Sequence, residues 1–193
     1  ETPDISILSN DFLAELEQME HKNFAIELLQ KLLDDQIKSH LRTNLVQEKK
    51  FSERLQSTML AYKNRNIESA QVIEKLIEMA KEFQESAKRG DKLGLNEDEI
   101  AFYDALANDE EAARILKDEI LKKIAHELTE KIRKNTSVDW QYRDSVQAKL
   151  RNMVRIILRK YKYPPSKQSE AIALVLEQAT KLADKWSTEK EIK

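Results

Sequence analysis

Histidines and carboxylates are the side chains of this sequence that are best suited to catalysis or metal binding. The sequence contains His21, His40 and His126 and no cysteine. A zinc hydrolase site needs two histidines four residues apart on one helix, and di-metal bundles use Glu-x-x-His; neither spacing occurs here. Without cysteine, thiolate metal sites, cysteine nucleophiles and disulfides are also excluded. We expect His126 to be a surface or half-buried structural residue.

The carboxylates are concentrated in residues 97–111, which contain seven Asp or Glu and no Lys, Arg or His. Hydrolysis by two carboxylates requires acids held apart in a cleft, with the pKa of one raised by burial. We interpret this run instead as acids on solvated helix faces and at helix N-termini, where the helix dipole favours negative charge. Pro3-Asp4 matches the start of a nuclease signature, but the strand that would hold magnesium is not predicted after it. The sequence therefore predicts a chain without catalytic residues, metal ligands or a small-molecule substrate.

The elements that position these side chains are expected to be helices. The 193 residues include two glycines and three prolines, too few for the turns of a sandwich, a barrel or an α/β fold. Two glycines also exclude a glycine-rich phosphate loop. A charged fraction of 35% beside a hydrophobic fraction of 40% is typical of charged helices around aliphatic seams. The expected fold class is all-α.

Apolar residues recurring at intervals of three and four predict a bundle of about eight helices and no strand. The helices are expected at about residues 11–20, 23–41, 44–64, 67–88, 97–106, 110–134, 139–163 and 166 to the end. We expect Gly90 to end the fourth helix in the left-handed conformation, and Asn96 and Glu99 to form a capping box. Two sub-bundles, residues 1–90 and 91–193, are predicted to join near Gly90; one continuous domain is the alternative.

The ends and overall charge of the chain carry less information. No apolar run approaches the ~20 residues of a membrane span, and no secretory leader is recognisable, so we expect no membrane contact and a cytoplasmic location. The first residue is Glu1, which indicates a piece of a longer polypeptide. A net charge of −2 does not by itself indicate a nucleic-acid-binding protein.

Positive charge is nevertheless concentrated in two segments. Residues 143–167 contain eight Lys or Arg and one Asp, a net charge of +7, and residues 42–66 contain six Lys or Arg and two Glu, a net charge of +4. The candidate partner- or DNA-binding residues in these segments are Arg151, Arg155, Arg159, Lys160, Lys162, Lys49, Lys50, Arg54 and Arg65.

The sharper of the two patterns is an arginine stripe on one predicted helix. Arg151, Arg155, Arg159 and Lys162 fall within a sector of roughly 80° of the helix, apart from its aliphatic face. Such a stripe suits an acidic protein surface or the phosphates of nucleic acid, and an ordinary solvated helix face is the third interpretation. Trp140 could serve as a base-stacking platform, as could Tyr161, but the spacing of both favours core packing.

The same segments carry a resemblance to a known family. The resembling stretches are residues 44–47 with 50–53, 62–68 with 70–74, 101–106, 138–140, 149–151, 158–165 and 175–179. Together they resemble the C-terminal helical domain of the R subunit, the motor and endonuclease subunit, of type I restriction–modification enzymes. Lys162 stands where that family more often has glycine between two tyrosines, which predicts a less tight turn. Asn64, Arg65 and residues 159–161 match its motifs, without a role that the resemblance assigns.

The resemblance implies a function that the residue patterns do not show. The parent chain would be a type I site-specific deoxyribonuclease with an N-terminal nuclease domain, two ATP-driven motor domains and a requirement for ATP and magnesium. The present chain would be a non-catalytic module without a cofactor of its own, docking that subunit onto the methyltransferase and specificity subunits. Direct binding of duplex DNA is the main alternative, and a purely structural spacer is a further one.

Overall fold

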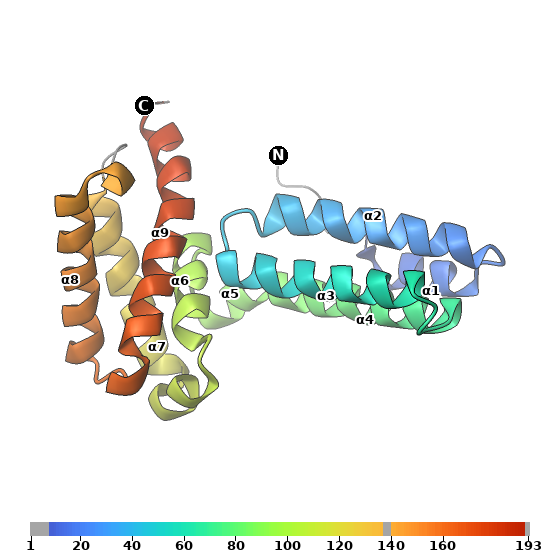
Figure 1. Ribbon diagram of the computed structural model, residues 1–193, viewed down its shortest axis with the longest axis horizontal. Helices are drawn as coiled ribbons and strands as arrows, with labels where there is room; N and C mark the ends of the chain where they lie inside the picture. Colours follow the sequence, from blue (N-terminus) through green and yellow to red (C-terminus); the bar gives the residue numbers. More distant parts are fainter. Residues whose placement is uncertain (1–7, 137–139, 192–193) are drawn as a thin grey trace. The chain divides into compact units, whose positions relative to one another are not determined.

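The structure is a computed structural model that describes residues 8–136 and 140–191; for residues 190 and 191 it describes the backbone alone. The all-α expectation is confirmed: the described part of the chain contains nine α-helices and no strand (Figure 1). One helix more than expected appears because the predicted break near Gly90 contains a short helix, α5. The helices are α1 (Asn10–Gln18), α2 (Lys22–His40), α3 (Leu45–Lys63), α4 (Ser69–Ala87), α5 (Arg89–Leu93), α6 (Glu97–Ala107), α7 (Glu110–Asn135), α8 (Asp144–Lys160) and α9 (Gln168–Glu191).

The chain divides into two compact units. The first contains Glu1–Arg42 and Gln47–Arg89, and the second contains Thr43–Val46 and Gly90–Lys193. Each unit buries a hydrophobic cluster of its own. The short Thr43–Val46 segment contributes to the second unit, because Gln178 of α9 binds it from two sides. The Gln178 side chain accepts a hydrogen bond from the Leu45 backbone N–H at 2.8 Å and donates one to the Thr43 carbonyl oxygen.

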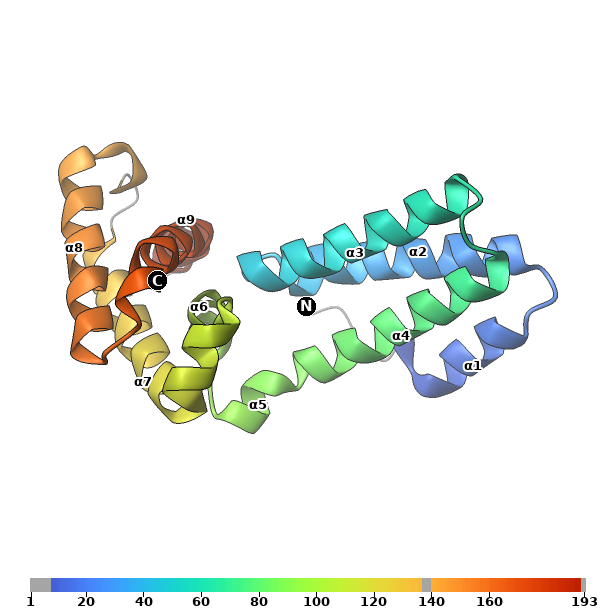
Figure 2. The ribbon, with the colours of Figure 1, turned by 60° about the horizontal axis from the view of Figure 1, so that its bottom comes forward.

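The first unit is built from α1 to α4. Helix α4 lies alongside α2 and also contacts α1 (Figure 2). Leucines of α2 and phenylalanines of α3 and α4 fill its core, since Leu29 and Leu33 are fully buried and Phe51 meets Phe83 edge to face with ring centroids 5.4 Å apart. The unit is therefore held mainly by aliphatic and aromatic packing.

The second unit is built around α6 to α9. Helix α6 packs against α7 and α9, and α8 packs against the same two helices (Figure 1). Trp140, in the short 3₁₀ turn before α8, and Trp186, near the end of α9, are both buried in its core. Trp140 is thereby confirmed as a packing residue and is unavailable for stacking on bases. The helix start expected at about residue 139 lies outside the described residues, and α8 begins at Asp144.

Helix α7 differs from the regular helix that its sequence predicts. Lys117 has φ 61° and ψ 167°, so two helical segments meet there at a kink. A steady four-residue repeat would continue the buried face from Leu116 to Ile120. Because the kink shifts the register, Leu121 is buried instead and Ile120 lies at the edge of the core.

Of the two helix ends whose caps the sequence predicts, one is confirmed and one is wrong. The capping box at the start of α6 is confirmed: the Glu99 N–H donates to the Asn96 side chain at 2.9 Å, and the Asn96 N–H donates to the Glu99 carboxylate at 3.1 Å. The prediction for Gly90 is wrong, because the chain continues helically through α5. Gly94 takes the left-handed conformation instead, with φ 68°.

Two further helices end through the same left-handed turn without a glycine. Arg65 after α3 and Lys162 after α8 have φ values of 57° and 58°. After α8 the Tyr163 N–H donates to the Leu158 carbonyl at 2.9 Å, and the Lys162 N–H donates to the Arg159 carbonyl at 3.0 Å, which together form a Schellman motif. The looser turn expected at Lys162 is therefore not observed; the turn closes fully, and its lysine sits in a strained conformation.

Candidate functional site

Most of the candidate residues in the first unit are used by the fold itself. Arg54 of α3 forms ion pairs with Glu82 at 2.5 Å and Glu78 at 3.8 Å, both from α4. Lys49 lies 3.9 Å from Glu53, and the Lys50 ammonium lies 5.8 Å from the centre of its neighbour's ring, Phe51. Arg65 is exposed, and its backbone forms the left-handed turn that ends α3. The predicted basic face on residues 42–66 is thus partly neutralised within the unit, at Arg54 and Lys49.

The arginine stripe of α8 is different. Arg151, Arg155 and Arg159 line the same groove, and none forms an ion pair or side-chain hydrogen bond with any described residue. Arg155 is half-buried, and the other two are exposed. Lys162, beyond the end of α8, is also exposed and unpaired among the residues described.

Lys160 points elsewhere, although the sequence groups it with Arg159. Its ammonium lies 2.9 Å from the carboxylate of Glu127 in α7. One residue along a helix is a rotation of about 100°, which moves Lys160 from the groove to the α7 side of α8. Arg159 and Lys160 therefore belong to two different surfaces.

The groove between α8 and α9 has a volume of about 670 Å³. The three arginines come from α8, and Gln168, Ser169 and the apolar side chains of Ile172, Ala173 and Leu176 come from α9, with Pro165 just before it. The lining contains no Asp or Glu. We refer to these lining residues together as the arginine groove.

The arginine groove carries an electrostatic cost. Arginines four residues apart repel one another, by about 0.2–0.5 kcal/mol for each such pair on an exposed helix. No carboxylate within the described residues offsets that cost at Arg151, Arg155 or Arg159. Arg159 lies in the last turn of α8, where the helix dipole favours positive charge, so this cost falls mainly on Arg151 and Arg155.

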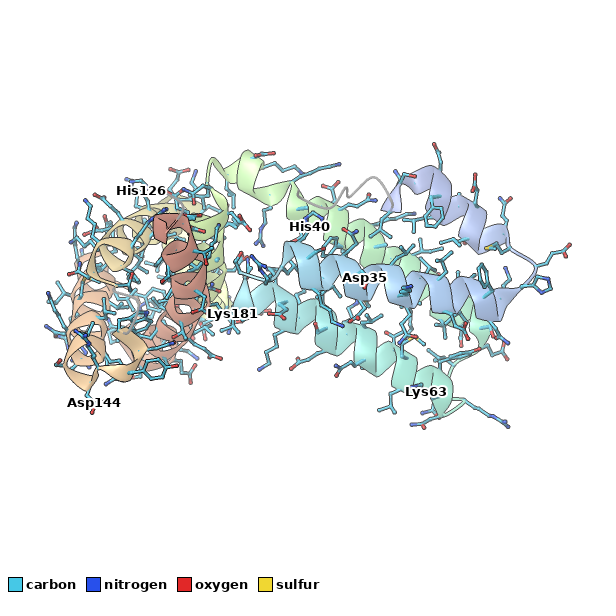
Figure 3. All side chains as sticks on the ribbon, turned by 90° about the horizontal axis from the view of Figure 1, so that it is seen from above. Asp35, His40, Lys63, His126, Asp144 and Lys181 are labelled. Carbon is cyan, nitrogen blue, oxygen red and sulfur yellow. The ribbon has the colours of Figure 1, made fainter. Side chains whose placement is uncertain are left out.

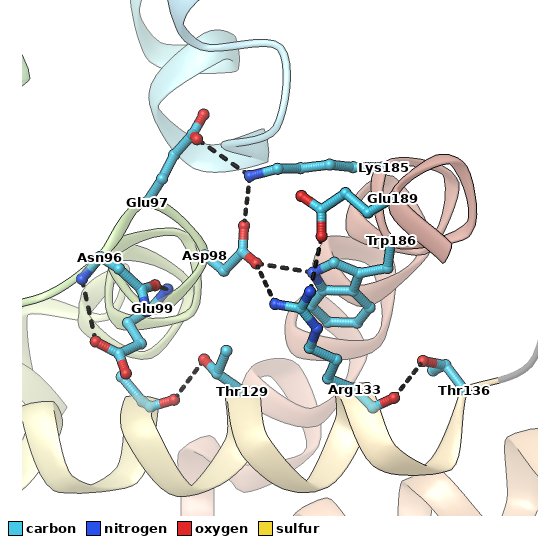
Figure 4. Close-up of polar contacts among 11 residues, drawn as sticks. Asn96, Glu97, Asp98, Glu99, Thr129, Arg133, Thr136, Lys185, Trp186 and Glu189 are labelled. Atoms are coloured by element: carbon cyan, nitrogen blue, oxygen red, sulfur yellow. Dashed lines mark hydrogen bonds and ion pairs between the residues drawn. The ribbon is translucent and has the colours of Figure 1, made fainter. Parts of the chain in front are cut away.

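A second polar cluster, around Asp98 of α6, contrasts with the groove. Asp98 accepts a hydrogen bond from the indole N–H of Trp186 at 2.7 Å and from the Lys185 ammonium at 2.9 Å (Figure 4). Arg133 of α7 lies 3.8 Å from the same carboxylate and 2.7 Å from Glu189. We call these five residues the Asp98 cluster; it joins α6, α7 and α9, and each of its charges has a partner.

The structure confirms that six of the seven acids in residues 97–111 lie at the N-terminal ends of α6 and α7, and corrects the expectation that all seven are solvated. Asp98, Glu99 and Asp104 are all buried. Asp104 accepts a hydrogen bond from the Asn44 amide at 2.7 Å, and Glu99 caps its own helix and meets His126. The sequence pattern predicted the Glu99 cap but missed the other contacts, because their partners are 27 to 88 positions away along the chain.

The titratable groups of α7 and α8 also serve the fold. Burial alone would raise the pKa of Glu127, but hydrogen bonds from Lys131, Lys160 and Tyr161 outweigh it and lower the pKa to about 2. The hydrogen bond to Glu127 raises the pKa of the Tyr161 hydroxyl. Tyr161 is half-buried and engaged with α7, as core packing predicts.

The histidines do not form a metal site. His40 lies in the first unit and the exposed His126 in the second, where its ring nitrogen is 2.7 Å from Glu99 (Figure 3). No group of three or more His, Asp or Glu side chains within residues 8–136 and 140–189 could hold a metal ion.

Comparison with known proteins identifies the family. The model of the family described as "Type I restriction enzyme HindI endonuclease subunit-like, C-terminal" matches residues 1–185. The chain belongs to this family. Over 182 residues it is 40% identical to the type I restriction enzyme HindI endonuclease subunit of Haemophilus influenzae, covering 94% of the chain and 17% of that protein. A protein of Methanocaldococcus jannaschii, named as the MjaIXP endonuclease subunit of a type I restriction enzyme, is 36% identical over 163 residues, covering 83% and 15%.

The family places the chain at the C-terminal part of a type I restriction endonuclease subunit, as the resemblance predicted. It spans about one sixth of the length of these two relatives. No solved structure matches it. None of the helices in the described part of the chain is long and apolar enough to cross a membrane.

Proposed function

We propose that this chain is the non-catalytic docking module of a type I restriction endonuclease subunit. In this proposal its helices hold that subunit against the methyltransferase and specificity subunits, in the cytoplasm. The nuclease and ATP-driven motor activities, with their ATP and magnesium, belong to other parts of the parent chain.

The arginine groove carries the proposal. Arg151, Arg155 and Arg159 line one groove without acidic partners among the described residues, whereas Lys160 and Lys185 of the same unit are paired with Glu127 and Asp98. Interfaces are enriched in arginine, because its planar guanidinium binds carboxylates in a bidentate manner and is weakly hydrated. A surface of this kind is expected to meet another protein or an anionic ligand.

Co-elution tests docking directly. We expect the 193-residue chain to elute from a size-exclusion column with the methyltransferase–specificity complex encoded beside it, at micromolar concentrations of both. A circular dichroism spectrum establishes that the chain is helical in the same buffer. Separate elution of two folded samples would contradict docking.

Duplex DNA is the second candidate, because the same unpaired arginines could neutralise phosphates. Release of counterions would then lower the affinity by about 0.9 log units per tenfold increase in salt for each phosphate contacted. Titration of a labelled duplex at several salt concentrations separates the candidates. An affinity that does not respond to salt, or no binding in low salt, rejects DNA binding by the chain.

A further inference from the structure

We infer that the arginine groove receives an acidic amphipathic helix from a partner subunit. Its carboxylates would face Arg151, Arg155 and Arg159, and its small apolar side chains would face Ile172, Ala173 and Leu176. The inference rests on the proposed docking function and names the segment of the partner that carries it.

Charge complementarity favours an acidic partner in the arginine groove. The three guanidinium groups form no pairs with the described residues. Glu127 of α7, an acid next to α8, is engaged with Lys131 and Lys160 instead. Arg155 is already half-buried, so a carboxylate placed against it would interact in a partly desolvated setting, where ion pairs are strongest.

The spacing of the arginines favours a partner segment that is helical. Residues four apart on a helix are separated by about 6 Å along its axis, so the stripe spans about 12 Å. A helix lying in the groove presents carboxylates at positions i, i+4 and i+8 with the same interval. Each acid of the partner then meets one arginine in register.

The apolar wall favours a protein helix over a duplex. A phosphate backbone offers no aliphatic side chains to cover the exposed Ala173 and the half-buried Leu176, whereas an amphipathic helix buries its apolar face in such a groove. Ala173 is exposed and small, so a second helix can approach α9 closely there. The two walls together match a helix that is acidic on one side and apolar on the other.

Two variants test the two walls separately. Arg155→Glu with Arg159→Glu reverses the charge of one wall, and Ala173→Trp fills the groove without changing charge. Matched controls are Arg114→Glu with Lys149→Glu, exposed basic residues of the same unit outside the groove, and Ala70→Trp at an exposed alanine of α4. Circular dichroism of all four variants shows whether each remains folded.

Binding is measured to an array of overlapping peptides covering the methyltransferase and specificity subunits, each long enough for four helical turns. We expect the bound peptides to carry acids at four-residue intervals beside apolar residues. Each groove variant should weaken them at least tenfold, and the controls should retain affinity within about twofold. If the wild-type chain binds no such peptide, or the groove variants bind as well as wild type, the inference is overturned.

The same variants in the co-elution experiment distinguish a failure of the groove as the binding site from a failure of docking itself. Co-elution of wild type that survives both groove variants keeps docking and rejects the groove as its site. Peptide binding without co-elution supports the groove and contradicts docking of the isolated chain. If the charge-reversed variant loses duplex binding while Ala173→Trp leaves it unchanged and no peptide binds, the groove is a phosphate site and the inference fails.

Discussion

The Asp98 cluster and the arginine groove lie in the same unit and use the same kinds of side chain with opposite results. Around Asp98, a buried carboxylate accepts from Lys185 and Trp186 and lies near Arg133, so three helices are joined by paired charges. In the groove, three arginines of α8 face apolar side chains of α9 with no acid among the lining residues. The charges of the first region are paired within the fold, whereas those of the second have no acidic partner among the described residues.

The difference shows how a structural charge can be told from a candidate binding charge. Lys160 and Arg159 are neighbours in sequence, yet Lys160 is held by Glu127 while Arg159 has no partner within the described structure. Positive charge counted along the sequence treats them as equal. Only the pairing decides which of them is available to a partner.

The largest expected effect on stability comes from a substitution that breaks the Asp98 cluster. Asp98→Ala should lower the free energy of unfolding by about 3 kcal/mol, because the buried indole N–H of Trp186 loses its acceptor and the partly buried Lys185 ammonium keeps only the more exposed Glu97. Both tryptophans of the chain lie in the second unit, so their fluorescence in a urea titration follows this unit alone. Asp98→Asn, which keeps an acceptor for the indole, should lose less.

The matched variant in the arginine groove is Arg155→Ala with Arg159→Ala. We expect it to change the free energy of unfolding by no more than about 0.5 kcal/mol, since repulsion is relieved and no pair is lost. A loss comparable to that of Asp98→Ala would show that the groove arginines serve the fold after all.

A second, smaller effect concerns pH. The pKa of Glu127 is lowered to about 2 in the folded chain, from about 4.3 in an unfolded one, so its ionised form stabilises the fold above the unfolded value. Glu127→Gln should therefore destabilise by roughly 2 kcal/mol at pH 7. The difference should shrink as pH falls from about 4.5 towards 2, where the folded carboxylate takes up its proton.

Urea titrations at a series of pH values measure this difference. Glu119→Gln on the same helix is the control, because the Glu119 side chain is 78% exposed and solvent screens its pair with Lys122. A Glu127→Gln difference that stays constant down to pH 2, or grows as pH falls, would contradict the assigned pairing with Lys131, Lys160 and Tyr161.

The smallest expected effect is a gain of stability next to the groove. Lys162 holds φ 58° without glycine's freedom, so Lys162→Gly should raise the free energy of unfolding of the second unit by about 1 kcal/mol. Lys149→Gly, at a right-handed position inside α8, should lower it by about the same amount. Equal losses in both variants would show that the turn after α8 places no demand on its backbone.

Sequence reasoning was most successful where the interactions are local. The capping box of Asn96 and Glu99 and the burial of Trp140 follow from spacing within a few residues, and both were found. Gly90 was misplaced because a five-residue helix, too short to show periodicity, follows it before the turn at Gly94. The kink at Lys117 was missed for a different reason, because the repeat of apolar residues in the sequence continues through it.

The sequence by itself determined that this chain is all-α, that Arg151, Arg155 and Arg159 share one helix face, and that it resembles its family. The first depends on composition, the second on a four-residue spacing along one helix, and the third on short stretches of sequence. Tertiary structure alone decided which charges are available, because Asp98, Glu127 and Arg54 acquire partners from other helices and the groove arginines do not. Charge pairing depends on which helices lie side by side, and no local pattern encodes that.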